Sequence, residues 1–209
     1  MQEIFKKYNC IGILGGTFNP VHNGHIALAD YVFSCIDGIE HIFFIPNNMP
    51  AYKELENQIS TDDRFTMLNL ALSGYQNISV SDIEIKRGGY TYTIDTLEEI
   101  RAINPRIKIY FIVGADSLYS FTGWVRYRDI LKLCSLIVLN RNSRKYELEQ
   151  FADRLTAKMG YGEIHIIDSP NIDISSSIIR DKISNQESIS DLVPAEVADY
   201  IYEHKLYTK

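Results

Sequence analysis

The sequence predicts an α/β fold, a doubly wound and mostly parallel sheet with a small helical part at the C-terminal end. Two observations predict it. Short apolar runs alternate along the chain with segments of helical periodicity, which is the order of a βαβ fold. Most of the runs are rich in Ile, Val and Phe, as strands buried on both faces of a sheet are. The 209 residues are enough for one domain, so we expect a single domain over 1–209, with about 170–209 as its C-terminal helical part.

The expected strands and helices follow one another in strict alternation. The strands are expected at Cys10–Leu14, His41–Ile45, Ile78–Ile85, Lys108–Val113, Ser135–Leu139 and Glu163–Ile167. The helices are expected at Gly24–Cys35, Thr61–Leu72, Ile94–Ile103, Val125–Leu133 and Tyr146–Lys158, with a tail helix near Pro194. Ligands of such sheets bind beyond the carboxyl ends of the strands. The loops expected to converge there follow Leu14, Ile45, Ile85, Val113 and Ile167.

Composition and charge narrow the class of protein. The net charge of −6 and the pI near 5.4 argue against a general nucleic-acid binder, which needs a basic face. Cys10, Cys35 and Cys134 are far apart and odd in number, so we interpret them as reduced core residues. The polar N-terminus has no signal-peptide pattern, and no apolar run approaches the length of about 20 residues that spans a membrane. We therefore expect a cytoplasmic protein that binds neither nucleic acid nor a membrane.

The segment after the first expected strand carries the strongest functional pattern. Gly15 and Gly16 lack a Cβ, so a polyphosphate could approach the backbone closely there. The next helix, for which Asn23 is the expected N-cap, would direct N–H groups at the same place. His22 and His25 lie on one side of a helical turn, and each ring can donate a hydrogen bond to phosphate. Taken singly, the glycine pair is equally well a plain turn and each histidine a solvated residue, and the segment is not a Walker loop.

Taken together, the residues of this segment resemble a known signature. Gly15-Gly16-Thr17-Phe18-Asn19-Pro20-Val21-His22-Asn23-Gly24-His25 is similar to the signature of the HxGH nucleotidylyltransferase superfamily, whose fold is Rossmann-like. Its members transfer a nucleotidyl group from a nucleoside triphosphate to a phosphate acceptor and release pyrophosphate. The resemblance implies that ATP is bound at Gly15, Gly16, Thr17, Phe18, His22 and His25, and that the two histidines are catalytic.

The loop after the second expected strand bears on the acceptor. Pro46-Asn47-Asn48-Met49-Pro50-Ala51-Tyr52-Lys53 is rich in turn formers, and taken alone it favours a solvated lysine over a phosphate ligand. The segment is similar to P-N-x-x-P-P-H-K/R of the nicotinate-nucleotide adenylyltransferases. The resemblance implies that Lys53 helps to hold the acceptor phosphate. Ala51 and Tyr52 depart from the pattern, so no imidazole stands at position 52.

The helix expected at 61–72 is interpreted as structural. Ser60 or Thr61 can cap its N-terminus. Phe65 and Leu68 follow the spacing of a buried stripe. We assign no chemistry to this helix.

The segment after the third expected strand reads first as a turn and a cap. Gly88-Gly89 would break the strand, and Thr93 would cap a helix whose exposed amides could hold a carboxylate. Without a further signal, a turn and a cap account for it. The segment is similar, however, to R-x-G-x-S/T-Y-T-x-D-T-L of the same adenylyltransferases. This implies that the backbone around Tyr92 and Thr93 contacts the carboxylate of nicotinate.

The fourth expected strand leads into a glycine turn and the only tryptophan. Asp116 can equally cap the next helix or accept a hydrogen bond from a ribose hydroxyl. Trp124 is either a core residue or a flat face on which a pyridine ring stacks. Gly114-Ala115-Asp116-Ser117-Leu118, with Phe121 and Trp124, resembles the family pattern G-x-D-x-L…F…W. This implies that Trp124 stacks on the nicotinate ring and that Gly114 and Asp116 lie against the nucleotide.

A second phosphate-facing segment stands near the C-terminal end. In Ile174-Ser175-Ser176-Ser177-Ile178-Ile179-Arg180, hydroxyls gather at a helix start with a guanidinium one turn further on. A capping cluster with a surface arginine is an equal alternative. The stretch is similar to the second superfamily signature, I-S-S/T-S/T-x-x-R. This implies that Ser175 and Ser176 hold the triphosphate and that Arg180 is a catalytic residue that neutralises its charge.

The resemblance runs from residue 11 to about 207. It implies adenylyl transfer from ATP to nicotinate mononucleotide, giving deamido-NAD and pyrophosphate in NAD biosynthesis. Mg²⁺ is expected on the substrate phosphates, with no metal-ligand residues from the chain. Two alternatives stay open: a sister enzyme acting on nicotinamide mononucleotide or phosphopantetheine, and a non-catalytic nucleotide-binding module. A homo-oligomer is compatible with the sequence, which does not give the oligomeric state.

Overall fold

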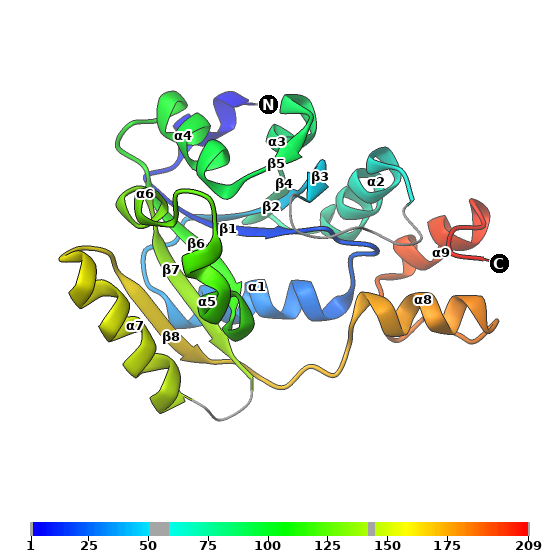
Figure 1. Cartoon of the computed structure of the whole chain (residues 1–209). Coiled ribbons are helices and arrows are strands. Elements are labelled where there is room, and N and C mark those ends of the chain that lie inside the picture. The colour runs from blue at the N-terminus through cyan, green and yellow to red at the C-terminus, as the bar shows by residue number, and fades with distance from the viewer. Residues whose placement is uncertain (1, 51–58, 142–144, 209) are drawn as a thin grey trace.

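A six-stranded parallel sheet forms the centre of the molecule (Figure 1). The computed structural model describes residues 2–50, 59–141 and 145–208. The strands of the sheet are β1 (Cys10–Gly16), β2 (His41–Pro46), β4 (Ile78–Val80), β6 (Lys108–Gly114), β7 (Ser135–Asn140) and β8 (Ile164–Asp168). Their order is β4-β2-β1-β6-β7-β8, and β1 pairs in parallel with β2 on one side and β6 on the other. The strand order therefore reverses at β1, as the predicted doubly wound sheet requires.

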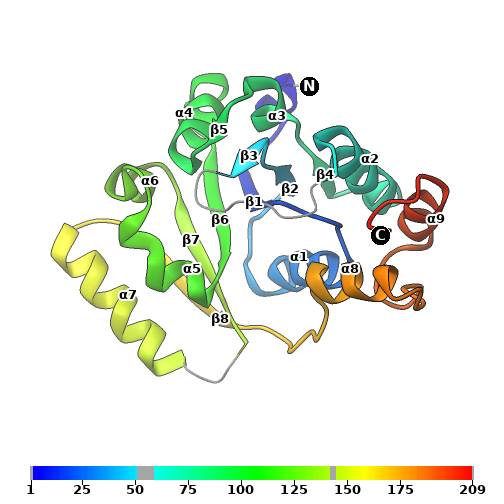
Figure 2. The same cartoon turned by 45° about the vertical axis from the view of Figure 1, so that its right-hand side comes forward.

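Helices cover both faces of this sheet (Figure 2). They are η1 (Gln2–Lys7), α1 (Asn23–Cys35), α2 (Thr61–Leu72), α3 (Ile83–Arg87), α4 (Thr93–Ile103), α5 (Ala115–Ser120), η2 (Phe121–Gly123), α6 (Tyr127–Leu133), α7 (Lys145–Met159), α8 (Ser176–Ser184) and α9 (Ala195–Glu203). Buried side chains of α1, α2, α8 and α9 share one hydrophobic core, and those of η1, α4, α6 and α7 share the other. A short parallel pair, β3 (Met49–Pro50) with β5 (Tyr90–Thr91), lies outside the main sheet.

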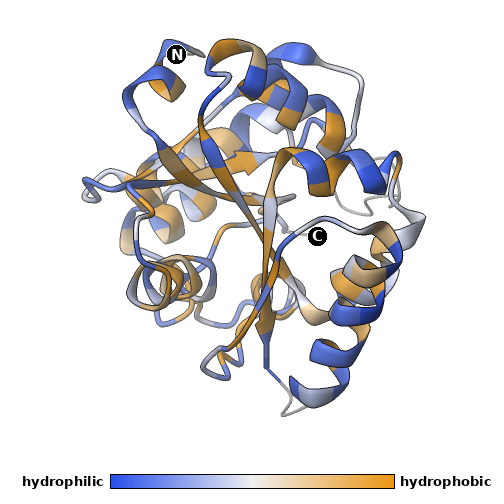
Figure 3. Cartoon of the chain, turned by 90° about the vertical axis from the view of Figure 1, so that its left-hand side faces the viewer, coloured by the Kyte–Doolittle hydropathy of each residue, from blue (hydrophilic) through white to orange (hydrophobic). Residues whose placement is uncertain are grey.

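Alternation along the central strands divides the side chains between the two cores. Ile11 and Ile13 of β1 lie in the core under α4 and α6, whereas Leu14 lies in the core under α1. Phe43 and Phe44 of β2 divide in the same way. Figure 3 shows the result: the strands are hydrophobic through the middle, and hydrophilic residues gather on the outer helices. This is why the strands read as continuous apolar runs in the sequence.

The expected strand at Ile78–Ile85 is wrong in its second half. The strand ends at Val80, and residues 83–87 form α3 instead. Alternating Ile83 and Ile85 resemble a strand, but the N–H of Gly88, which has a φ of 70°, closes the helix onto the carbonyls of Glu84 and Ile85. A glycine in this left-handed region is a common helix terminator.

Three helix starts also differ from expectation. His22, not Asn23, is the N-cap of α1, and Tyr92, not Thr93, is the N-cap of α4. The helix expected from residue 125 begins only at Tyr127, because Arg126 takes a left-handed conformation with a φ of 53°. The cap expected at Ser60 is confirmed, since its Oγ accepts a hydrogen bond from the Asp63 N–H at 3.0 Å.

Two of the three cysteines behave as expected. Cys10 and Cys134 are buried, but Cys35 is exposed, so its assignment to the core was wrong. Cys35 is the last residue of α1 and is not among the residues that this helix buries. Within the described ranges, no helix has the length and apolar character needed to cross a bilayer.

Candidate active site

A pocket of about 310 Å³ opens at the carboxyl ends of β1 and β6, where the strand order reverses. This is the position at which doubly wound sheets bind ligands. The residues expected from the sequence that line it are Gly15, Gly16, His25, Tyr92, Thr93, Gly114 and Trp124. The pocket therefore gathers residues from both the expected ATP site and the expected acceptor site.

The loop after β1 exposes backbone and buries its aromatic ring. Gly15 is exposed, and a Cβ at Gly16 would lie 3.1 Å from Cζ of Phe18. Phe18 is 3% exposed, and its ring centre lies 5.0 Å from that of His25 in an edge contact. The buried ring of Phe18 therefore packs against the loop and against the ring of His25. Thr17 is held by two bonds: its Oγ1 accepts from Asn47 and its carbonyl accepts from Arg64.

The two histidines of the first signature form a stacked pair. Their ring centres are 3.6 Å apart, with an angle of 28° between the planes. The backbone N–H of His22 donates to Nδ1 of His25 at 3.3 Å, so a neutral His25 ring carries its proton on Nε2. His25 lines the pocket, whereas His22 is 7% exposed and its Nδ1 has no hydrogen-bond partner among the described residues.

Burial keeps both rings neutral. Desolvation, with a smaller contribution from Arg141, lowers the pKa of His22 to about 4. Desolvation, followed by His22 and then Arg141, holds the pKa of His25 well below its ordinary value. The pair therefore carries no charge at neutral pH before a ligand arrives. An approaching phosphate would raise both pKa values, because a negative charge favours the protonated ring.

Close packing explains why a glycine stands between the two histidines. A Cβ at Gly24 would lie 3.0 Å from Nδ1 of His22 and 3.1 Å from Cγ2 of Ile172. Both distances are shorter than ordinary carbon contacts, and His22 is buried, so the ring could not remain in place.

Gly24→Ala is therefore expected to lower turnover about tenfold, since small displacements of a catalytic group are costly. Overpacking should also reduce the free energy of unfolding by about 1–3 kcal/mol. Steady-state kinetics and thermal unfolding measure the two effects. Gly74→Ala is the matched control, because nothing lies within 4 Å of a Cβ there. Normal turnover in Gly24→Ala would show that the position of His22 does not matter.

The second signature lies directly against the first. Arg180 donates from Nη1 to the carbonyl of Asn19 at 2.7 Å, and Ser176 donates from Oγ to the carbonyl of Pro20 at 2.8 Å. Ser175 is the N-cap of α8, and its Oγ accepts from the N–H of Ile178 at 3.2 Å. The structure thus brings Ser175, Ser176 and Arg180 to the loop that precedes the histidine pair. These three residues border the loop and are not part of the lining of the 310 Å³ pocket.

The side of the pocket expected to bind the acceptor has two walls. One wall is the start of α4, where Tyr92 is the N-cap and Thr93 the first helical residue, and a helix N-terminus favours a carboxylate. The other wall is Trp124, which is half-buried. Its ring meets Phe111 edge-on at 6.2 Å and Phe121 at 5.4 Å. Trp124 is therefore both packed against the core and part of the pocket lining.

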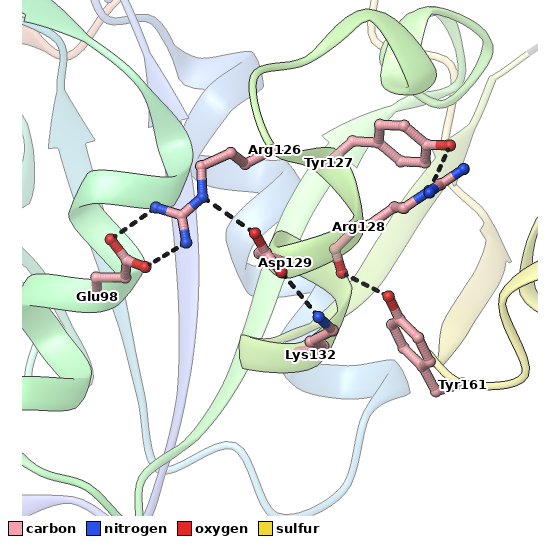
Figure 4. A network of polar contacts seen from close by, with 7 residues as sticks. All are labelled: Glu98, Arg126, Tyr127, Arg128, Asp129, Lys132 and Tyr161. Carbon is pink, nitrogen blue, oxygen red and sulfur yellow. Dashed lines mark hydrogen bonds and ion pairs between the residues drawn. The ribbon is translucent and has the colours of Figure 1, made fainter.

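An ion-pair network ties these two walls together (Figure 4). Arg126, two residues after Trp124, donates from Nη1 and Nη2 to both carboxylate oxygens of Glu98 on α4, at 3.1 and 2.8 Å. Its Nε donates to Asp129 on α6 at 3.0 Å. The network joins α4 to α6 through partly exposed side chains, and Arg126 directly follows the pocket residues Trp124 and Val125 in the chain.

Comparisons with known proteins identify the family. The cytidylyltransferase-like family model matches residues 13–182. A probable nicotinate-nucleotide adenylyltransferase of Carboxydothermus hydrogenoformans is 41% identical over 197 residues, which cover 94% of this chain and 97% of the relative. Its counterpart in Dehalococcoides mccartyi strain CBDB1 is 39% identical over 200 residues, which cover 95% and 97%. The chain belongs to the nicotinate-nucleotide adenylyltransferase family.

Solved structures with the same fold carry the same family name. Plasmodium falciparum nicotinic acid mononucleotide adenylyltransferase, solved in complex with NaAD, superimposes with a TM-score of 0.76 at 21% identity and covers 96% of this chain and 98% of that one. The complex of the same Plasmodium enzyme with APC gives a TM-score of 0.74 at 20% identity, with the same coverage of both chains. The likeness confirms the predicted Rossmann-like nucleotidylyltransferase fold.

Some residues expected from the nicotinate-nucleotide adenylyltransferase pattern are not brought to the pocket. Asp116 is exposed in the first turn of α5 and is not part of the pocket lining. It does not cap that helix either, because Gly114 is the N-cap. Lys53, with Ala51 and Tyr52, lies outside the described residues, so its role stays a prediction.

Two residues that line the pocket were missed from the sequence. Arg141 follows β7 directly and lines the pocket, and a basic residue straight after a buried strand was a usable signal. Glu84 also lines the pocket, and burial raises its pKa to about 7 although Thr96 donates a hydrogen bond to it at 2.6 Å. Placing residues 78–85 in one strand hid this carboxyl group.

Proposed function

We propose that this chain transfers the adenylyl group of ATP to nicotinate mononucleotide, giving deamido-NAD and pyrophosphate in NAD biosynthesis. One observation carries the proposal: Arg180 and Ser176 of the second signature bond to Asn19 and Pro20 of the first, beside the pocket at the strand-order reversal. The names of the relatives support the choice of acceptor.

The proposed mechanism needs no protein nucleophile. The acceptor phosphate attacks the α-phosphorus of ATP in line, and pyrophosphate leaves. Catalysis is then positioning plus stabilisation of the charge that develops on the phosphates. His22 and His25 donate hydrogen bonds to the ATP phosphates, and Gly15 and Gly16, which lack a Cβ and line the pocket, allow their close approach.

The remaining ATP contacts are proposed along the bordering segments. Arg180, with the hydroxyls of Ser175 and Ser176, holds the triphosphate tail. Thr17 and Phe18 contribute through the backbone of the loop, because the Thr17 side chain is already bonded and the Phe18 ring is buried. Gly114 and Asp116 remain our proposal for contacts with the nucleoside.

The acceptor is proposed to bind between the two walls of the pocket. Trp124 stacks on the nicotinate ring, and the N–H groups at Tyr92 and Thr93 hold its carboxylate. A helix N-terminus favours a carboxylate over an amide, because its partial positive charge stabilises the anion. Lys53 is proposed for the acceptor phosphate.

Magnesium is proposed to bind through the substrate phosphates and water. Mg²⁺ is a hard cation that keeps several waters and is usually bound through substrate phosphates, which is the reason for this proposal. When bound it would neutralise charge on the triphosphate.

We also propose a cytoplasmic location, based on the odd number and wide spacing of the cysteines. A homo-oligomer stays an expectation.

An acceptor panel tests the proposed function. Pyrophosphate release is measured with ATP and Mg²⁺ and each of three acceptors: nicotinate mononucleotide, nicotinamide mononucleotide and phosphopantetheine. The expected result is turnover with the nicotinate acceptor at least about tenfold above the amide, and loss of turnover when a chelator removes the metal, with the fold unchanged. Preference for another acceptor would reassign the chain to a sister activity. Binding of ATP without turnover on any acceptor would make it a nucleotide-binding module.

A further inference from the structure

We propose that Arg64 is a positioning residue that sets the spacing between the ATP-phosphate loop and the acceptor pocket. This inference rests on the proposed function. Arg64 lies in the first turn of α2, a helix to which the sequence assigned only a structural role, and it is 2% exposed. Long charged side chains are seldom buried to this extent.

The guanidinium joins the loops after β1 and β2. Nη1 donates to the carbonyl of Thr17 at 2.8 Å. Nη2 donates to the carbonyls of Asn47 at 2.7 Å and Asn48 at 3.3 Å, and to Oγ1 of Thr61 at 3.2 Å. A single planar group therefore holds the first-signature loop and the acceptor-side loop at a fixed separation.

The contacts continue from this centre to the acceptor wall. The side chain of Asn47 donates to Oγ1 of Thr17 at 3.1 Å. The backbone N–H of Asn48 donates to Oγ1 of Thr91 at 3.2 Å, and its side-chain amide donates to the carbonyl of Gly89 at 3.1 Å. Thr91 directly precedes Tyr92, and both line the pocket. A chain of hydrogen bonds thus runs from the residue after Gly16 to the proposed carboxylate site.

The chemistry of the site favours a role in positioning. Among the described residues no carboxylate pairs with Arg64 in a salt bridge, so neutral oxygen acceptors, mostly backbone carbonyls, balance a buried charge. That arrangement is costly in free energy, and replacing it with apolar packing is often neutral or stabilising. In-line transfer, in contrast, needs the attacking oxygen and the phosphorus within a few tenths of an ångström of their reactive separation. Lysine cannot substitute fully, because its ammonium is a point donor that cannot reach acceptors on two loops in fork geometry.

The test compares Arg64→Lys and Arg64→Met with the same changes at Arg101. Arg101 is the matched control: it also holds two carbonyls, those of Pro105 and Leu133, and it also has a buried Nε without a partner among the described residues. It is not part of the lining of the active-site pocket. Thermal unfolding, kcat, and calorimetric binding of ATP alone and acceptor alone are measured for each protein.

We expect both Arg64 variants to lose roughly tenfold or more in kcat, while binding of each single substrate changes by less than about threefold. The Arg101 variants should show similar losses of Tm and an unchanged kcat. Equal falls in kcat at the two positions, or an unchanged kcat in Arg64→Met, would overturn the proposal. Absence of turnover in the unaltered protein would instead reject the proposed function, so the two failures are distinguishable.

A second pair of variants keeps the inference testable if the Arg64 variants fail to fold. Thr91→Val removes the hydroxyl at the far end of the hydrogen-bond chain and leaves Arg64 intact. We expect it to lower kcat, and Thr91→Ser, which keeps the hydroxyl, to recover most of the loss. The same kcat in Val and Ser variants would show that the chain of hydrogen bonds does not position the substrates.

Discussion

His25→Ala is expected to lower kcat by roughly 10²- to 10⁴-fold while the fold persists, as for loss of a group that stabilises developing charge. His25 lines the pocket, and its Nδ1 already accepts from the His22 backbone, so its Nε2–H is the donor left for a phosphate. Pyrophosphate release measures the loss, and circular dichroism checks the fold.

His41→Ala is the matched control for this variant. His41 is also a buried histidine, and desolvation lowers its pKa to about 4; desolvation lowers the pKa of His25 too. It lies at the amino end of β2, whereas the pocket is at the carboxyl ends of the strands, and its ring bonds to Ser79 at 2.8 Å. Its removal should reduce stability and leave kcat unchanged. Near-normal turnover in His25→Ala would remove His25 from the mechanism.

The pH dependence of stability and of ATP binding gives a second test of the role proposed for the two histidines. The pKa of His22 is about 4 in the folded chain against an ordinary value of 6.5. The stability that this neutral ring contributes is fully present above 6.5 and is lost as the pH falls towards 4, because the unfolded chain binds the proton more readily. Triphosphate favours the protonated rings, so ATP binding should take up protons and tighten as the pH falls below about 7. Calorimetry in two buffers of different ionisation enthalpy should show less proton uptake in His25→Ala.

Trp124→Ala is expected to raise the KM for the acceptor roughly 10- to 10²-fold, while the KM for ATP changes by less than about threefold. The reason is the stacking of an aromatic base on a tryptophan face, which is worth about 1–3 kcal/mol. The ring of Trp124 meets Phe111 edge-on and Phe121 at a tilt, and its place in the pocket lining leaves it accessible to a ligand. Initial-rate kinetics with each substrate varied in turn measure the two constants.

Two further variants separate stacking from packing. Trp124→Phe keeps a flat ring and should recover most of the acceptor affinity. Tyr119→Ala removes a 41% exposed ring that packs on Phe151 outside the pocket lining, and should change neither KM. Equal losses of ATP and acceptor affinity in Trp124→Ala, together with a lower Tm, would assign Trp124 to the core alone.

The central strands were predictable because strands buried on both faces appear in the sequence as continuous apolar runs. β1, β2, β6 and β7 are continuous apolar runs, and their expected ranges differ from the observed ones by one or two residues at the C-terminal end. α3 was not predictable on this ground, because in five residues an alternating pattern and a helical one cannot be told apart. The start of α6 depends on the left-handed conformation of a single residue, Arg126, and no pattern in the sequence indicates that conformation.

The candidate site was predictable only where residues follow one another in the chain. The glycine pair, the histidines and the Ser175–Arg180 segment are local patterns, and the structure brings them together. Arg64 looked like an ordinary helix residue, since its role arises from two loops that α2 meets only in the fold. The ring of Phe18 was expected with the ligand but lies beneath the loop, a difference set by its φ of 50°.

The loop at Asn19 and Pro20 is fastened by residues from the far end of the chain: Ser176, Arg180 and Tyr207, whose hydroxyl donates to Oδ1 of Asn19 at 2.7 Å. During synthesis on the ribosome, the strand and histidines of the first signature emerge early but lack these fastenings. A chain that has been translated only through β8 contains all six strands of the main sheet but lacks Ser176, Arg180 and Tyr207, which bond to this loop. We therefore expect the loop at Asn19 and Pro20 to reach its final position only after these C-terminal residues have been made.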